Sequence, residues 1–175
     1  MSAETAPERT ADGRWVVVGG RRWRASDPAI PERWRHELVD ELMDARRAVG
    51  AAGRAHDDEA VTRARARVQW SKLALGERGR AWWEEPTDGA ERRRLEAILR
   101  TLARHRAPDR TICPSDVARA RGDEAWRGRL DLVRDIARDL ARAGDVVVTQ
   151  KGEVLEPDRP WRGPIRIGMP SASEP

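Results

Sequence analysis

Basic side chains at helical spacing are the residues of this chain best suited to contact another molecule. On a helix over Glu124 to Ala143, with residues at 100° steps, four arginines fall within about 80° of one another on the exposed side. They are Arg127, Arg134, Arg138 and Arg142. A guanidinium binds phosphate through paired hydrogen bonds, so this row indicates contacts with nucleic acid. Lys151, at the tip of an expected hairpin, is a second candidate for phosphate contact.

Acidic residues interrupt this row. Three arginines follow an aspartate by three positions, in the pairs Asp131–Arg134, Asp135–Arg138 and Asp139–Arg142. Such pairs stabilise a helix by about 0.2–0.5 kcal/mol and reduce the charge available to phosphates. Arg127 has no aspartate at this spacing. Nucleic acid and a protein partner therefore both stay open as binding partners.

Other residues that carry chemistry are isolated in the sequence. Cys113 has no neighbouring histidine to activate it, so a buried strand residue is the favoured interpretation. His36, His56 and His105 are scattered and lack the paired spacing of a zinc site. Asp27 lies in Ser-Asp-Pro, which is ordinary turn and cap chemistry. We expect no metal, no cofactor and no catalysis.

The run Arg21 to Arg24 mixes three arginines with Trp23. Cations beside an aromatic ring can hold nucleic acid by charge and stacking. The favoured alternative is a buried Trp23 with arginines that are solvated or paired with acids of the next helix. Those acids are Glu37, Asp40 and Glu41.

The second half predicts helix, short helix, helix and hairpin. Leu95, Ile98 and Leu102 mark the first helix, Pro114 opens the short one, and the third covers Glu124 to Ala143. Thr111 to Cys113 can add a short strand to the hairpin at 146–155. This order predicts a winged helix. Its expected core is Leu95, Ile98, Leu102, Val117, Trp126, Leu130, Val133, Leu140 and Val147.

The first half predicts a hairpin and two helices. Strands on either side of Gly19-Gly20 place Trp15, Val17 and Trp23 on an expected buried face. The two helices begin near Pro31 and Asp57, and Trp82-Trp83 is expected to dock this half onto the second. The fold class is therefore α+β and mostly helical. The predicted division is a disordered tail at 1–12, a hairpin and two-helix module at 13–86, a winged helix at 90–168 and a disordered tail at 169–175.

Composition limits the classes of protein. Lysine occurs twice among the 34 basic residues of this 175-residue chain, and the formal net charge is only +4. A single cysteine excludes an internal disulfide and suits a reducing compartment. No uncharged apolar run approaches the roughly 20 residues of a membrane helix. We expect a cytoplasmic protein that does not contact membranes, with an oligomeric state that the sequence leaves open.

Three ordered motifs resemble a known family. They are Thr111 to Arg119, Val148 to Gly152 and Arg162 to Ile167. Over residues of about 90–167 the chain resembles a bacterial family of winged-helix domains of unknown function. Its first half is similar to a segment of other uncharacterised bacterial proteins. The resemblance implies a fold and no established activity, so the expected function is non-enzymatic: nucleic-acid binding or regulation, or alternatively protein interaction.

Overall fold

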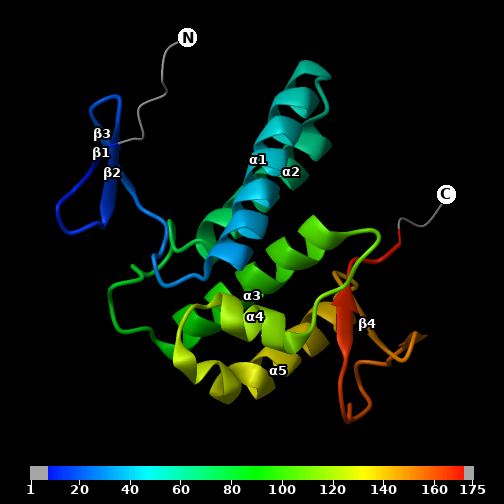
Figure 1. Cartoon of the computed structure of the whole chain (residues 1–175). Helices are drawn as coiled ribbons and strands as arrows, with labels where there is room; N and C mark the ends of the chain where they lie inside the picture. Colours follow the sequence, from blue (N-terminus) through cyan, green and yellow to red (C-terminus); the bar gives the residue numbers. More distant parts are fainter. Residues whose placement is uncertain (1–7, 172–175) are drawn as a thin grey trace.

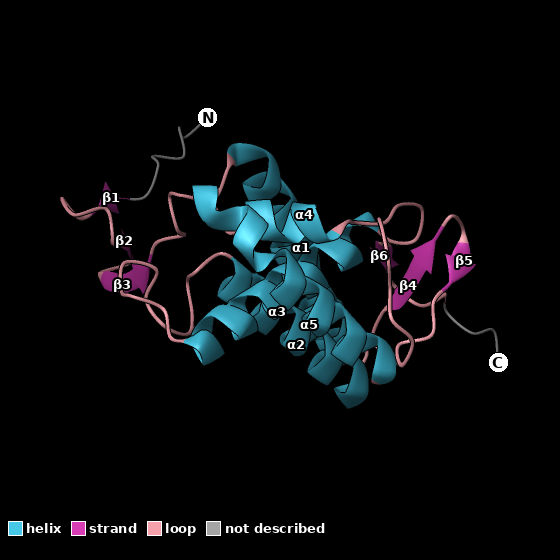
Figure 2. Cartoon of the chain, turned by 90° about the horizontal axis from the view of Figure 1, so that it is seen from below, coloured by secondary structure: helices cyan, strands magenta, loops and turns pink. Residues whose placement is uncertain are grey.

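Helices lie between two small antiparallel sheets in the computed structural model, which describes residues 8–171 (Figures 1 and 2). The N-terminal sheet contains β1 (Glu8–Arg9), β2 (Trp15–Val18) and β3 (Arg21–Arg24), in the order β1-β2-β3. The hairpin predicted at Gly19-Gly20 is confirmed. Both glycines have positive φ, of 56° and 74°, as this tight turn requires. The expected α+β fold class is also confirmed.

Two expectations for this region need correction. Glu8 and Arg9 pair with β2, so the expected disordered tail is wrong for them, and residues 1–7 lie outside the described part. Trp23 is 52% exposed and is not on the face of Trp15. The register pairs Trp23 with Val16, and opposite residues of a sheet share a face, so Trp15 and Trp23 point to opposite sides.

Helices α1 (Glu32–Arg54) and α2 (Asp58–Ala74) form a pair that projects from the molecule (Figure 1). The side chain of Asp57 accepts a hydrogen bond from the backbone N–H of Ala60 and caps α2. Leu38 and Leu42, four residues apart on α1, and Leu73 on α2 are buried, so both helices turn an apolar face to the core.

The second half begins with α3 (Asp88–Arg106) and α4 (Pro114–Ala120). The helix predicted over Glu124 to Ala143 is divided into a 3₁₀ segment, η1 (Glu124–Arg129), and α5 (Leu130–Arg142). Thr87 caps α3 by accepting from Ala90 N–H, and Asp123 caps η1 by accepting from Ala125 N–H. A 3₁₀ first turn is a common way for a helix to begin.

The C-terminal sheet has the order β5-β4-β6. Its strands are β4 (Val147–Gln150), β5 (Glu153–Val154) and β6 (Arg166–Gly168). Ile112 pairs with Ile167, as expected for a short strand before α4. β4 and β5 form the predicted hairpin, and Lys151 and Gly152 occupy its turn with φ of 51° and 87°. Of the expected tail at 169–175, Met169 packs partly buried against the core, and residues 172–175 lie outside the described part.

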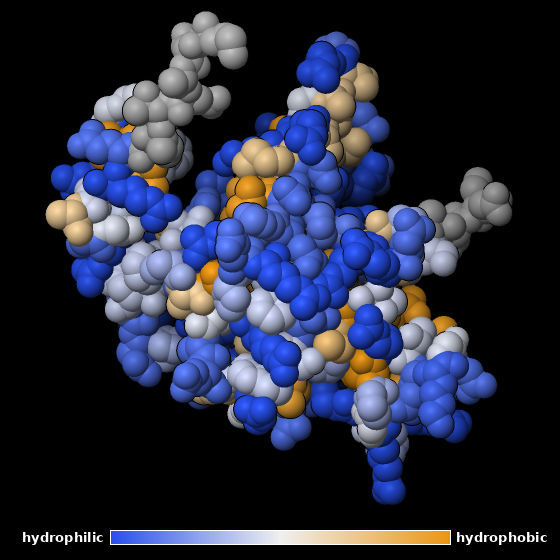
Figure 3. Space-filling view, viewed as in Figure 1, coloured by the Kyte–Doolittle hydropathy of each residue, from blue (hydrophilic) through white to orange (hydrophobic). Residues whose placement is uncertain are grey.

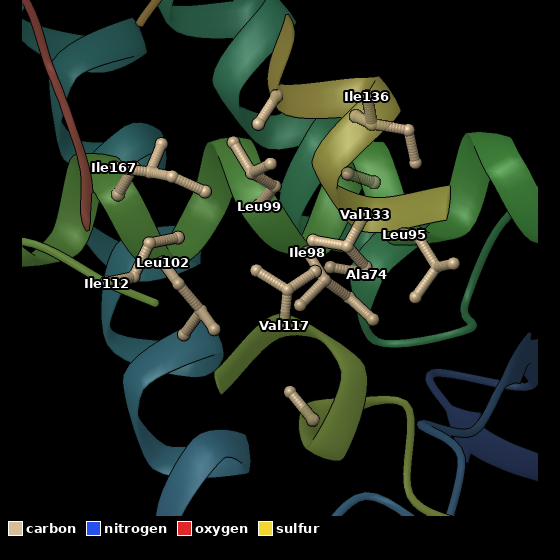
Figure 4. Close-up of a cluster of buried hydrophobic side chains, with 14 of the residues drawn as sticks. Ala74, Leu95, Ile98, Leu99, Leu102, Ile112, Val117, Val133, Ile136 and Ile167 are labelled. Carbon is tan, nitrogen blue, oxygen red and sulfur yellow. The ribbon is translucent and has the colours of Figure 1, made fainter. Parts of the chain in front are cut away.

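One buried cluster joins the two halves. Figure 4 shows its centre, where Ile98 of α3 lies close to Val117 of α4 and Val133 of α5. Leu38, from the first half, belongs to the same cluster.

Most of the predicted core is confirmed, with exceptions. Trp126 and Leu130 are only partly buried, and Val147 is replaced in the cluster by Val146 and Val148, because alternate residues of a strand face opposite sides.

Trp82 and Trp83 are half-buried and hold the N-terminal sheet. Trp83 meets Trp15 and Trp82 edge-on, with ring centroids 5.7 Å and 4.9 Å away. The indole N–H of Trp82 donates to the carbonyl of Ala25 at 2.9 Å. Trp82 also lines a small cavity together with Arg94 of α3.

Gly122→Ala is expected to lower the free energy of unfolding by about 1–3 kcal/mol. Gly122 has a φ of +96°, and a Cβ placed there would lie 2.3 Å from the carbonyl oxygen of Ala29 in the first half. Thermal or urea unfolding measures the change. Gly128→Ala is the matched control, since a Cβ at Gly128 meets nothing within 4 Å. Equal effects of the two substitutions would contradict this close approach.

Candidate nucleic-acid interface

The outer face of α5 is covered by the segment that follows β5. Arg134 donates to the carbonyls of Trp161 and Gly163, at 2.8 Å and 3.2 Å. Arg138 donates to the carbonyl of Pro157 at 3.0 Å, and its guanidinium lies 4.6 Å from the ring centroid of Trp161. These arginines therefore fasten the 156–163 segment to the helix.

Two of the three predicted aspartate–arginine pairs form on α5. Asp135 pairs with Arg138 at 3.3 Å, and Asp139 pairs with Arg142 at 3.2 Å. Arg142 also pairs with Asp158 at 2.8 Å. The charges of Arg138 and Arg142 are thus balanced within the molecule, which leaves α5 with less free positive charge than its sequence suggests.

Arg127 lies in a different environment, at the start of the third helix. Its guanidinium lies 4.3 Å from the ring centroid of Trp126, and that of Arg119, from α4, lies 4.2 Å from the same ring. Both arginines are exposed. Within residues 8–171, no carboxylate lies at ion-pair distance from either. We call Arg119, Trp126 and Arg127 the arginine–tryptophan stack.

The first half completes the surroundings of this stack. Pro31 and Trp34 of the first half line an open depression of about 500 Å³ together with the stack and the turn at Gly122. The indole N–H of Trp34 is buried and has no acceptor among residues 8–171, and Arg33 lies 5.4 Å from the Trp34 ring centroid. Aromatic faces and free guanidinium groups thus gather where the two halves meet.

Partly buried ion pairs fix the position of η1. Arg129, in η1, donates to Glu91 of α3 at 2.6 Å and is held by Asp123. The hydrogen bond from Arg129 lowers the pKa of Asp123 below its usual value. Arg121 pairs with Glu91 at 3.1 Å, so one carboxylate of α3 holds arginines on both sides of the α4–η1 turn.

This network extends into the first half through Asp27. Its carboxylate accepts from Arg94 at 2.7 Å and from Arg121 at 3.5 Å, and also from the backbone N–H of Ala29. Burial and then the nearby charge of Arg121 lower the pKa of Arg94 from its usual value, while Asp27 opposes that shift. The expected turn role of Asp27 is confirmed, but its ion pairs across the two halves were not predicted.

The predicted site residues are only partly brought together. Gln150, beside Lys151, donates to the carbonyls of Arg162 and Pro164, next to the Gly163 carbonyl that Arg134 contacts. The hairpin tip therefore lies along the side of α5 that carries Arg134. Arg127 precedes Arg134 by seven residues and therefore lies about two helical turns away from it. The sequence analysis did not identify Arg119, because its contact with Trp126 depends on how α4 packs on η1.

Residues considered for nucleophilic or metal chemistry stay apart. Cys113 is partly buried at the start of α4, where its backbone N–H donates to Asp116 at 3.1 Å. His36, His56 and His105 lie on separate segments. Across residues 8–171, no three His, Cys, Asp or Glu side chains are grouped to hold a metal ion.

The stretch 92–170 matches the model of a protein family of unknown function (DUF3253). A search of curated proteins found no match. The matched stretch contains most of α3 and all of α4, α5 and the C-terminal sheet. In the described part of the chain, no helix has the length and apolar character needed to cross a membrane.

Proposed function

We propose that this chain binds nucleic acid without catalysing a reaction and that its second half is a winged helix. Helices α3, α4 and η1–α5 followed by a small sheet have the element order of that fold. The bridge between Ile112 and Ile167 corresponds to its first short strand, and Lys151-Gly152 to the tip of its wing. These features support the identification.

The arginine–tryptophan stack is the observation that carries the proposal. Two of its members, Trp126 and Arg127, lie at the start of the third helix, the part that reaches the nucleic acid in helix-turn-helix proteins. Guanidinium groups neutralise phosphates, and an aromatic ring gives unpaired bases a stacking surface. Arg119 and Arg127 are exposed and have no carboxylate partner within residues 8–171, so their charge is available to a ligand.

The other basic residues take separate roles in this proposal. Lys151 is exposed at the hairpin tip and provides a phosphate contact away from the stack. Arg134 and Arg138 hold the 156–163 segment against α5 and act as positioning residues. The principal contacts are therefore Arg119, Arg127 and Lys151.

Arg127→Ala is expected to weaken binding to all sequences alike and to lower the slope of log K against log salt by about 0.9. Arg119→Ala should act in the same way. Fluorescence anisotropy with labelled duplex and single-stranded DNA, from about 50 to about 200 mM salt, measures both quantities. Arg54→Ala is the matched control, because Arg54 is exposed at the other end of α1 from Trp34, about 30 Å along the helix.

Binding that is unchanged by Arg119→Ala and Arg127→Ala would contradict the assignment of the stack. The absence of binding even at low salt would contradict nucleic-acid binding altogether. Thermal unfolding of each variant checks that the fold is retained.

A protein partner is the second candidate function, and a specific observation favours it. The charged groups on α5 are largely satisfied within the molecule, whereas Val18 and Trp23 in the N-terminal hairpin are 55% and 52% exposed. The face of the molecule seen in Figure 3 is mostly hydrophilic, with small separate hydrophobic areas. If nucleic acid fails to bind at low salt, the protein-interaction function is the one to pursue.

A further inference from the structure

A second cavity lies between the α1–α2 pair and the second half, away from the arginine–tryptophan stack. Its volume is about 310 Å³, at the lower end of the range of about 300–1,000 Å³ for small-molecule pockets. Side chains from α1, α2, α3 and the segment around β4 line it. We call it the interhelical cavity.

Hydrogen-bond acceptors line part of this cavity. Glu41 is only 3% exposed, and one of its carboxylate oxygens accepts from Nε of Arg67 at 2.7 Å. Its other oxygen accepts no hydrogen bond from any residue between 8 and 171. The buried hydroxyls of Ser71 and Thr101 donate to carbonyls of their own helices, at 3.0 Å and 2.7 Å, so their lone pairs remain. A ligand that carries an N–H or O–H donor suits this wall.

Four arginines line the cavity, and three of them form ion pairs. Arg63 pairs with Glu59, Arg67 with Glu41, and Arg100 with Glu96 and Asp145. Arg104 is exposed and lines the cavity, and in the described chain no carboxylate lies at ion-pair distance from it. A single free guanidinium suits a monoanion, and a carboxylate can accept two of its hydrogen bonds.

The remaining wall is apolar and includes an aromatic ring. Trp70 is half-buried, and the guanidinium of Arg100 lies 4.8 Å from its ring centroid. Ala66, Val146 and Met169 supply further apolar surface. We propose that the interhelical cavity binds a small aromatic carboxylate that also carries a hydroxyl or amino donor. The donor is recognised by Glu41, the ring by Trp70 and the carboxylate by Arg104.

Isothermal titration of the full chain with 4-hydroxybenzoate tests this site, because the probe has a carboxylate and a hydroxyl at opposite ends of one ring. The expected result is saturable one-site binding below about 5 mM, weakened about tenfold, or by about 1.4 kcal/mol, in Arg104→Ala. Benzoate, which lacks the donor, should bind more weakly than 4-hydroxybenzoate. Ala66→Leu should reduce binding by occupying part of the cavity while leaving the ion pairs in place.

Arg93→Ala is the matched control, since Arg93 is exposed on the same helix as Arg104 and does not line this cavity. It should bind 4-hydroxybenzoate as the parent does. No saturable binding by the folded parent protein, or equal binding by the parent and Arg104→Ala, would overturn the proposal. Nucleic-acid binding is proposed for a different surface. If the protein fails to bind DNA in the anisotropy experiment, the outcome of the 4-hydroxybenzoate titration is therefore unaffected.

Discussion

Ile98→Ala should lower the free energy of unfolding by about 2–5 kcal/mol. Ile98 is completely buried on α3, where it lies close to Val117 and Val133 at the centre of the cluster (Figure 4). Truncation removes three carbons from contact with α4 and α5 and leaves a cavity that a close-packed interior fills only in part. Urea unfolding followed by tryptophan fluorescence measures the loss.

Val154→Ala is the control for Ile98→Ala. Val154 is 70% exposed in β5, so its truncation removes little buried surface and should change stability by less than about 0.5 kcal/mol. Similar losses for the two variants would show that α3 does not face the core as described. The comparison therefore tests the placement of the central helix of the fold.

Local apolar spacing was sufficient to predict the main helices. Leu95, Ile98 and Leu102 share one face of α3 and are all completely buried. Spacing succeeds here because a helix that packs on a core must repeat its buried side chains every three or four residues. The hairpin at Gly19-Gly20 was found for a similar local reason, since few residue pairs tolerate two positive φ angles.

The face of Trp23 was predicted wrongly, although the turn that determines it was predicted correctly. A two-residue turn pairs Val18 with Arg21, so counting outwards places Trp23 opposite Val16. Trp15 and Trp23 then lie on opposite faces, although both are large and apolar. The correct face was within reach of the sequence, because the turn length alone determines this pairing.

The candidate interface could be predicted only in part. Arg127 is exposed, as the helical spacing indicated, because its neighbours along the chain determine its side of the helix. The partners of Arg134 are backbone carbonyls 27 and 29 residues away, in a segment without periodic side chains. Any residue type provides a carbonyl, so no sequence signal marks such a contact. The Arg119 contact likewise depends on the angle at which α4 meets η1.

The ion pair between Asp27 and Arg94 escaped the sequence analysis for the same reason. The two residues are 67 positions apart, and Asp27 already had a local role in its turn. Their side chains are 4% and 10% exposed. Burial of two charged groups is tolerated because each compensates the other, so the loss of one partner is more costly than the loss of both.

Asp27→Asn should therefore lower the free energy of unfolding by about 3–5 kcal/mol, because it leaves the buried Arg94 without its carboxylate. An asparagine oxygen can still accept from Ala29 N–H, so the turn at Asp27 is kept and the lost charge is isolated. In the double variant Asp27→Asn with Arg94→Met, the unpaired charge is gone, and stability should recover most of that loss.

Urea unfolding of the parent, both single variants and the double variant gives the coupling energy. Asp135→Asn, which breaks an exposed pair on α5, is the control and should change stability by less than about 0.5 kcal/mol. Additive losses in the double variant would show that Asp27 and Arg94 do not act as a pair, and the ion pair of Arg106 on α3 with Glu37 on α1 would then be the polar link left between α3 and the first half.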